Sequence, residues 1–349
     1  MRFFNFDLHI SVIEDVKHIF KALGHEVDSC CISGHHFVFN NKTEPLDIVN
    51  QYNWQQLTPE MCDAFYERYK DEFKDYDGFI VTYPPAFSLL FEKFNKPIII
   101  YAPIRYETPF TKNPTLLKWF NDFLKRGIDS KQIILVANSV YEQKYCEFFL
   151  DRPCSYITNW CDYGDTYPKW TGTDPRFLLF NDSNIKIESS RIQDRHTLQK
   201  PYKWETIEAY KGIIHIPYNI STMSTYEQYT ANTPLFFPSQ SFLLEMMQGD
   251  TNVLCGLTWN QYHNLPPAEG DNPNNYKDIN VLKKWLPLAE YYNQESMPYI
   301  TYFDSFNHFV EMIKNEQVDF ADISDKMKAH NIVKKHKIHN DWKELLDKI

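Results

Sequence analysis

The sequence predicts an α/β protein built from two Rossmann-like domains. Its first half alternates short apolar runs with segments of helical periodicity, as parallel, doubly wound sheets do. The turn-rich, apolar-poor stretch 162–175 interrupts this alternation, which then resumes, so we place a linker there. A chain of 349 residues is also long for a single core, and it fits two domains of ordinary size.

The first half supplies the elements of one sheet. Arg2–Phe6 is a short apolar run, and Ile13–Leu23 has helical periodicity before Gly24, a residue type that commonly ends helices. The other expected strands are 27–32, 78–83, 97–101, 133–137 and 156–159, and the other expected helices are 54–73, 86–94, 116–125 and 140–149. Because strands and helices alternate, we expect the sheet to be parallel.

The second half is less regular. The expected strands are 176–180, 212–218, 234–238 and 297–303, and the expected helices begin at Ser224 or cover 286–292, 306–313 and 341–349. A Pro/Asn-rich loop is expected over 265–278. We predict domain boundaries at 1–162 and 175–335.

Composition excludes several classes of function. The net charge is −10 and no dense basic block occurs, so nucleic acid is not an expected partner. The tail from Lys326 carries seven lysines and is interpreted as a solvated helix face, with a peripheral contact to an anionic membrane surface left open. Glycine is scarce, at 10 residues, and neither G-x-G-x-x-G nor a P-loop motif occurs.

The sequence predicts a cytoplasmic protein. Its seven cysteines are odd in number and irregularly spaced, which favours reduced thiols over a disulfide framework. Asp7 and His9 interrupt any signal-peptide pattern, and no apolar run approaches the 18 residues of a membrane span.

Residues 211–239 carry the most informative functional pattern. Small polar residues separate the strand 212–218 from the helix expected at Ser224. Backbone amides, hydroxyls and the positive end of a helix dipole suit a phosphate or pyrophosphate, and open α/β sheets bind nucleotides at the carboxyl ends of strands. The alternative is a plain capping box, S-x-x-E, formed by Ser224 and Glu227.

The same segment resembles the donor-binding segment of GT-B glycosyltransferases. Glu227 stands four residues before Ala231 and seven before Pro234, which opens an apolar strand. The resemblance implies transfer of a sugar from a nucleotide sugar in a cleft between the two domains. It also implies that the terminal helix, 336–349, packs back on the N-terminal domain.

The resemblance assigns roles to several residues. It implies that the turn Ser221–Ser224 meets the diphosphate and that Glu227 meets the donor's ribose or sugar. Many retaining members have E-x7-E here, but this chain has Asn219 at the first position, which favours an inverting mechanism. The residues predicted to bind the donor are Asn181, Ser183, Arg191, Ser221, Thr222, Met223, Ser224 and Glu227. Arg195, Lys200 and Lys203 remain alternatives to Arg191, and His215 is interpreted as a core histidine.

Glycosyl transfer also needs a base that removes the proton of the acceptor hydroxyl. His9 is the preferred candidate, because it follows the first strand, where histidine-dependent inverting GT-B enzymes tend to place theirs, and its ordinary pKa suits the task. Asp7 is expected to orient His9 or to act as the base itself. His35, His36 and Glu107 are predicted on the acceptor side, with a surface ion pair to Arg105 as the alternative for Glu107.

These observations predict a hexosyl- or pentosyltransferase of glycan biosynthesis. The resemblance implies a nucleotide sugar as donor, a glycan or another hydroxyl compound as acceptor, and a reaction that inverts the sugar without a metal or cofactor. One alternative is an enzyme like the nucleotide-sugar 2-epimerases, which would need carboxylates in the cleft. The other is a non-catalytic protein of the same fold that binds nucleotide sugars or glycans.

Overall fold

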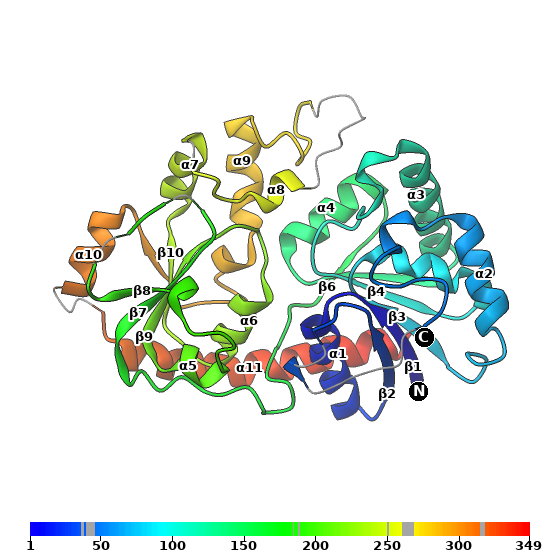
Figure 1. Ribbon diagram of the computed structural model, residues 1–349, viewed down its shortest axis with the longest axis horizontal. Coiled ribbons are helices and arrows are strands. Elements are labelled where there is room, and N and C mark those ends of the chain that lie inside the picture. Colours follow the sequence, from blue (N-terminus) through cyan, green and yellow to red (C-terminus); the bar gives the residue numbers. More distant parts are fainter. Residues whose placement is uncertain are drawn as a thin grey trace. The chain divides into compact units, whose positions relative to one another are not determined.

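The computed structural model describes residues 1–35, 38–39, 46–183, 185–187, 189–249, 251–259, 269–314 and 318–349. Within these residues the chain forms two compact units. The first unit contains Met1–Asn159 and His339–Ile349, and the second contains Trp160–Trp259 and the stretch that ends at Ile338. Figure 1 shows that each unit consists of a sheet flanked by helices.

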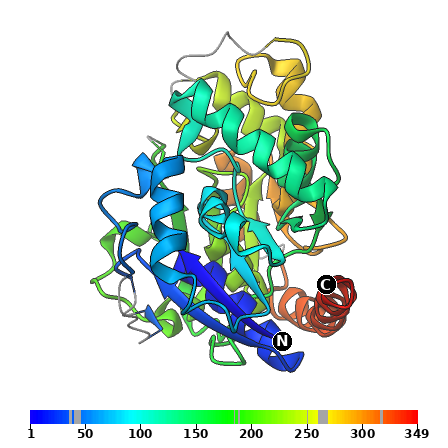
Figure 2. The same cartoon turned by 90° about the vertical axis from the view of Figure 1, so that its right-hand side faces the viewer.

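The first unit is built on a six-stranded parallel sheet (Figure 2). Its strands are β1 (Arg2–Asp7), β2 (Glu26–Cys31), β3 (Gly78–Val81), β4 (Ile98–Ala102), β5 (Ile133–Ala137) and β6 (Ser155–Tyr156). They lie in the order β2-β1-β3-β4-β5-β6. The strands β3 and β4 are buried along their whole length, because helices cover both faces of such a sheet.

Three of the four α-helices described in the first unit begin directly after a residue whose side chain caps them. The four helices are α1 (Ile10–Ala22), α2 (Pro59–Tyr69), α3 (Pro114–Asp129) and α4 (Val140–Leu150), and Pro85–Phe94 is a 3₁₀ helix. The single helix predicted over 54–73 is divided, because Thr58 caps α2 by accepting the N–H of Met61 and Pro59 starts that helix. Trp54–Gln56 forms a separate 3₁₀ turn.

The second unit has a five-stranded parallel sheet in the order β11-β10-β9-β7-β8. The strands are β7 (Asp174–Asn181), β8 (Ile192–Asp194), β9 (Tyr210–Ile216), β10 (Leu235–Pro238) and β11 (Thr301–Phe303). The sequence did not predict β8, which is only three residues long and half-buried. The predicted fold class, α/β with two Rossmann-like units, is confirmed by the two parallel sheets.

The helices of the second unit differ more from expectation. They are α5 (Trp204–Glu208), α6 (Met223–Thr230), α7 (Gln240–Gln248), α8 (Gly256–Trp259), α9 (Ile279–Trp285), α10 (Phe306–Lys314) and α11 (Phe320–Leu346). The predicted helix 286–292 is instead two 3₁₀ turns, interrupted by the extended backbone of Ala289. Pro287 has no N–H to donate to the carbonyl of Lys283, so the α-helical bonding of α9 does not continue into this segment.

Helix α11 is much longer than the predicted terminal helix, and its last turns belong to the first unit. There Trp342 is fully buried, with its ring 5.2 Å from that of Phe20 and 5.3 Å from that of Tyr101. Farther up the helix, in the second unit, Asn331 donates to the carbonyl of Tyr229, at the end of α6.

The stretch interpreted as a linker is part of the second unit. Tyr163 and Tyr167 are buried there, and both rings pack on Trp204. Asp162 is tied to α11 through Lys335, at 2.8 Å. The turn-forming residues are therefore irregular backbone, as expected, but the tyrosines among them pack into the second unit.

Two further expectations concern the whole chain. All seven cysteines are free thiols, as predicted, and five of them are buried. Among the described residues, none of the helices has the length and apolar character needed to cross a membrane.

Candidate functional site

Both sheets have a topological switch point, where consecutive connections leave in opposite directions. In the first unit it lies between β1 and β3, because β2 is on one side of β1 and β3 on the other. In the second unit it lies between β7 and β9, with β8 beyond β7. Open α/β sheets bind ligands outside the carboxyl ends of the strands at such points.

Asp7 ends β1 at the switch point of the first unit. Its side chain is fully buried, and one oxygen accepts the backbone N–H of His9 at 2.7 Å. The other oxygen accepts the N–H of Thr82 at 3.0 Å and of Tyr83 at 3.2 Å, as well as the Thr82 hydroxyl. Burial raises the pKa of Asp7 to about 6, although these hydrogen bonds oppose the shift.

His9 is the residue that immediately precedes α1, and its side chain is exposed. Its ring meets that of Tyr83 edge to face, at 6.5 Å between centroids. The pKa of His9 lies below its ordinary value, because surrounding protein atoms desolvate the ring and because His35 lies near. His9 therefore has the neutral form a base needs, while Asp7 fixes its backbone rather than its ring.

His35 follows β2 and is exposed, with its N–H bound to the hydroxyl of Ser33. It lies on the same edge of the sheet as His9, because β2 is parallel to β1. The predicted acceptor residue His36 is outside the described residues.

Glu107 is not on the surface. It is fully buried and accepts the hydroxyl of Tyr145 at 2.6 Å, while Arg105 pairs with Glu142 at 2.5 Å. The predicted surface pair of Arg105 and Glu107 is therefore wrong, because Arg105 also stacks over Tyr141 inside the unit. A side chain without exposed surface offers no contact to an acceptor in this structure.

A small recess marks the switch point of the second unit. It is lined by residues that follow β7 and β8, by the end of β9 and by the start of α6, among them Asp182, Arg195, His215, Asn219, Thr222, Ser224 and Thr225. Its volume is about 20 Å³. The recess joins residues separated by more than 40 positions in the chain, from Asp182 to Thr225.

Asn181 and Ser183 shape the loop that carries Asp182. The side-chain oxygen of Asn181 accepts both the N–H and the hydroxyl of Ser183, at 2.9 and 2.6 Å. Its amide nitrogen donates to the carbonyl of Ile185 at 2.7 Å. These two predicted donor residues thus hold one wall of the recess, and Asp182 between them contributes to its lining.

Arg195, rather than Arg191, reaches the recess. Arg195 follows β8, pairs with Asp182 at 2.5 Å and lies over the ring of Phe180. Its Nε is buried without a hydrogen-bond partner among the described residues. Arg191 precedes β8 at the other edge of the sheet, where it donates to the carbonyl of Ile313. Both arginines lie in one polar stretch before α5, so their positions in the sequence did not show which of them would reach the recess.

The start of α6 is one residue earlier than predicted. Thr222 occupies the N-cap position, and its hydroxyl lies 2.8 Å from that of Thr225. Ser224 is therefore inside the helix, so the alternative of a capping box with Glu227 is wrong. Thr222 and Ser224 line the recess, whereas Met223 does not, and the Ser221 hydroxyl lies 3.2 Å from that of Tyr226.

Glu227 points to a different part of the unit. Its carboxylate accepts the hydroxyl of Tyr163 at 2.5 Å, and it is not among the residues that line the recess. Two faces of α6 thus have separate partners. Thr225 lines the recess, and Glu227 bonds to the stretch after Trp160. The role of Glu227 in donor binding stays a prediction.

His215 is buried at the end of β9 and is stacked on Phe237. Its Nε2 lies 2.6 Å from Oε1 of Gln228, on α6. Burial lowers the pKa of His215 to about 4, so the ring is neutral at neutral pH. The interpretation of His215 as a core residue agrees with its burial. The i, i+3 spacing of Thr225 and Gln228, which puts both on one face of α6, was the available signal for its polar contact.

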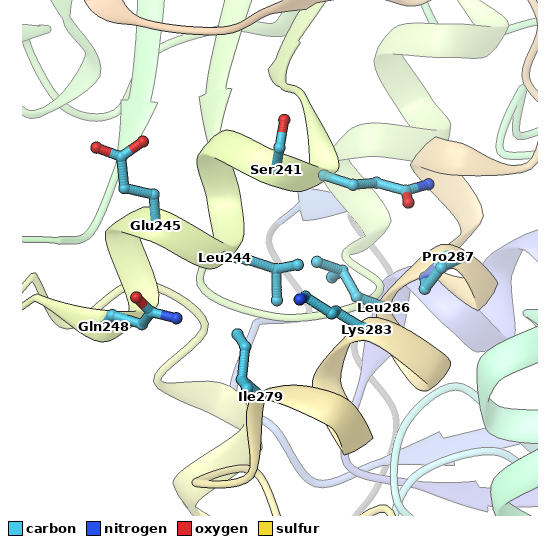
Figure 3. A pocket seen from close by; sticks show the side chains of 9 residues that line it. Ser241, Leu244, Glu245, Gln248, Ile279, Lys283, Leu286 and Pro287 are labelled. Carbon is cyan, nitrogen blue, oxygen red and sulfur yellow. The ribbon is translucent and has the colours of Figure 1, made fainter.

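A larger groove lies between α7 and α9 (Figure 3). Leu244 of α7 and Ile279 of α9 point toward one another across it, Lys283 extends toward Leu244, and Glu245 points away. Its volume of about 410 Å³ is in the range of small-molecule sites. Among the described residues, no group of three His, Cys, Asp or Glu side chains is arranged to hold a metal ion.

Comparisons with protein-family models and with curated proteins find no match. Solved structures that resemble the chain include the glycotransferase of kitacinnamycin, at 8% identity, with 99% of this chain and 98% of that chain covered and a TM-score of 0.47. Another is the glycosyltransferase SsfS6 from Streptomyces sp. SF2575, at 10% identity, with 95% and 96% covered and a TM-score of 0.45.

A third is the spinosyn rhamnosyltransferase SpnG complexed with thymidine diphosphate, at 10% identity, with 95% and 96% covered and a TM-score of 0.39. The likeness of all three extends over nearly the whole chain.

Proposed function

We propose that this protein is a glycosyltransferase that moves a sugar from a nucleotide sugar to a hydroxyl acceptor. The observation that carries the proposal is the recess at the switch point of the second unit. Polar residues predicted from the sequence to meet the donor, Thr222 and Ser224, line that recess together with Arg195. Nucleotides bind to open α/β sheets at this edge.

The donor would lie over the recess rather than inside it. A volume of about 20 Å³ admits about one water molecule, so a diphosphate needs the open surface beside it. The start of α6 and the hydroxyls of Thr222 and Ser224 would bind the phosphates there.

His9 would take the proton of the acceptor hydroxyl. Three features support this role: the ring is exposed, its pKa is lowered, and Asp7 fixes the backbone at His9. A general base must be unprotonated before it acts, and a lowered pKa keeps His9 so at neutral pH. The expected product has the inverted anomeric configuration, as the resemblance of the donor segment implies.

Thermal unfolding in the presence of nucleotides tests the proposal directly. A ligand that binds only the folded protein raises the melting temperature. At a ligand concentration of 100 times the dissociation constant, the folded state is stabilised by about 2.7 kcal/mol. UDP, GDP, CDP, ADP and dTDP are the probes, with inorganic phosphate as the control for plain anion binding. A shift with one nucleoside diphosphate supports the donor site; no shift with any of them would contradict it.

A further inference from the structure

The recess of the second unit has the size of a single polar group. Its volume of about 20 Å³ corresponds to about one water molecule. It also carries little net charge, because Asp182 and Arg195 pair at 2.5 Å. A phosphate would have to approach the Asp182 carboxylate, a like charge, whereas a neutral hydroxyl would not.

His215 is one of the residues that line this recess. Only 5% of the residue is exposed; its ring is stacked on that of Phe237, at 4.7 Å, and is tilted against that of Phe180, at 5.2 Å. Nε2 is directed at Oε1 of Gln228. Within the described part of the chain, Nδ1 has no hydrogen-bond partner, while His215 lines the recess.

Gln228 contacts one of the two ring nitrogens and thereby favours one tautomer. Its Oε1 is an acceptor, so the neutral ring of His215 places its proton on Nε2 and leaves a lone pair on Nδ1. Burial, which lowers the pKa of His215 to about 4, prevents a second proton at neutral pH. The recess thus combines the Nδ1 acceptor with a donor, the buried Nε of Arg195.

We propose that the recess binds one hydroxyl group of the sugar nucleotide, which donates to Nδ1 of His215, and that Gln228 is the positioning residue that keeps this nitrogen available. A hydroxyl fits because it donates and accepts at once. The inference rests on the proposed function, and it assigns the hydroxyl to His215 rather than to Glu227. The hydroxyl belongs either to the ribose, as its 2′-OH, or to the transferred sugar.

The test uses the double variant His215→Phe/Gln228→Leu. Phenylalanine keeps a ring against Phe237, and leucine removes the polar partner that would otherwise be left unsatisfied. Replacing both members of a buried hydrogen bond by apolar groups is close to neutral for stability, so this variant is expected to fold. His330→Phe is the matched control, since His330 belongs to the same unit and bonds to the carbonyl of Ser296 instead.

Calorimetric titration compares UDP, GDP, CDP and ADP with their 2′-deoxy forms and with the corresponding nucleotide sugars. If the ribose supplies the hydroxyl, the wild-type protein and His330→Phe bind the ribonucleotide about 3- to 10-fold more tightly than its 2′-deoxy form, and the double variant binds both equally. If the transferred sugar supplies it, the double variant binds the nucleoside diphosphate normally and loses a similar factor for the nucleotide sugar only.

If the double variant binds the nucleotides, their 2′-deoxy forms and the nucleotide sugars with the same relative affinities as the wild-type protein, the inference is wrong and the proposed function stands. No binding of any nucleotide by the wild-type protein overturns both. The single variant Gln228→Leu tests the positioning role through the ¹⁵N chemical shifts of His215. The wild-type ring is expected to show protonated Nε2 and bare Nδ1, and the variant a mixture of tautomers; an unchanged tautomer with unchanged affinity would leave Gln228 a structural role alone.

Discussion

Asp7 binds the backbone of His9 and not its ring: the Asp7 carboxylate accepts the His9 N–H at 2.7 Å. Its second oxygen accepts the N–H groups of Thr82 and Tyr83, which follow β3. One buried carboxylate therefore links the ends of the two strands of the switch point and fixes the residue that precedes α1. The predicted orienting role of Asp7 is indirect, because it acts on the chain that carries the imidazole.

Asp7 should make stability depend on pH. Its folded pKa of about 6 exceeds its ordinary value of 3.8, so folding favours the protonated form. The contribution is present in full below pH 4 and is lost as the pH rises through 6; about two pKa units correspond to about 3 kcal/mol. In urea unfolding, the Asp7→Asn variant is expected to lack this loss. Asp151→Asn, at a side chain that is 96% exposed, serves as the control, and parallel pH curves for wild type and Asp7→Asn would contradict the prediction.

His9→Ala should abolish transfer while nucleotide binding remains. Removing a general base typically lowers the rate by about 10²- to 10⁴-fold. His35→Ala, at an exposed histidine on the same edge of the sheet, should have the smaller effect on the catalytic rate. The measurement is the rate of sugar transfer at saturating donor, with donor affinity determined separately. Full activity in His9→Ala would move the base elsewhere.

Substitutions at the two ends of the hydrogen bond between Tyr163 and Glu227 distinguish a structural role of Glu227 from a role in donor binding. Tyr163→Phe and Glu227→Gln disturb the same 2.5 Å hydrogen bond, so both should lower the free energy of unfolding, by about 1.5 to 3 kcal/mol when the carboxylate is charged. Their effects should not add in the double variant. If Glu227 also meets the donor, Glu227→Gln alone weakens nucleotide-sugar binding. Equal donor affinities in the two single variants would show that the predicted donor contact of Glu227 is wrong.

Arg105→Met should be among the most destabilising substitutions in the first unit. It leaves Glu142 buried without its cation, which typically costs about 3 to 5 kcal/mol. Lys118→Met breaks an exposed pair with Asp122 on α3 and should cost about 1 kcal/mol or less. Urea midpoints of the two variants provide the comparison. Similar losses in both would mean that the buried pair contributes no more than a surface pair.

Long, periodic segments were predictable from the sequence, and short or irregular ones were not. The strand Ile133–Ala137 was located at its exact bounds, because a five-residue apolar run rich in β-branched residues is too short for a helix and favours a strand. The three residues of β8 have no such pattern, and only pairing with β7 makes them a strand. Most of α11 was also not predicted, because the many polar residues on its surface mask the apolar pattern of its buried side.

The sequence by itself determined the α/β class, the division of strands between two sheets and the polar turn before α6. These depend on local periodicity and turn chemistry, which neighbouring residues express directly. Only the tertiary structure decided that Arg195 rather than Arg191 lies at the recess, that Glu227 bonds to Tyr163, and that Gln228 bonds to His215. Those outcomes depend on which residues distant in the chain share one sheet edge, and strand order, which spacing along the chain does not encode, sets that neighbourhood.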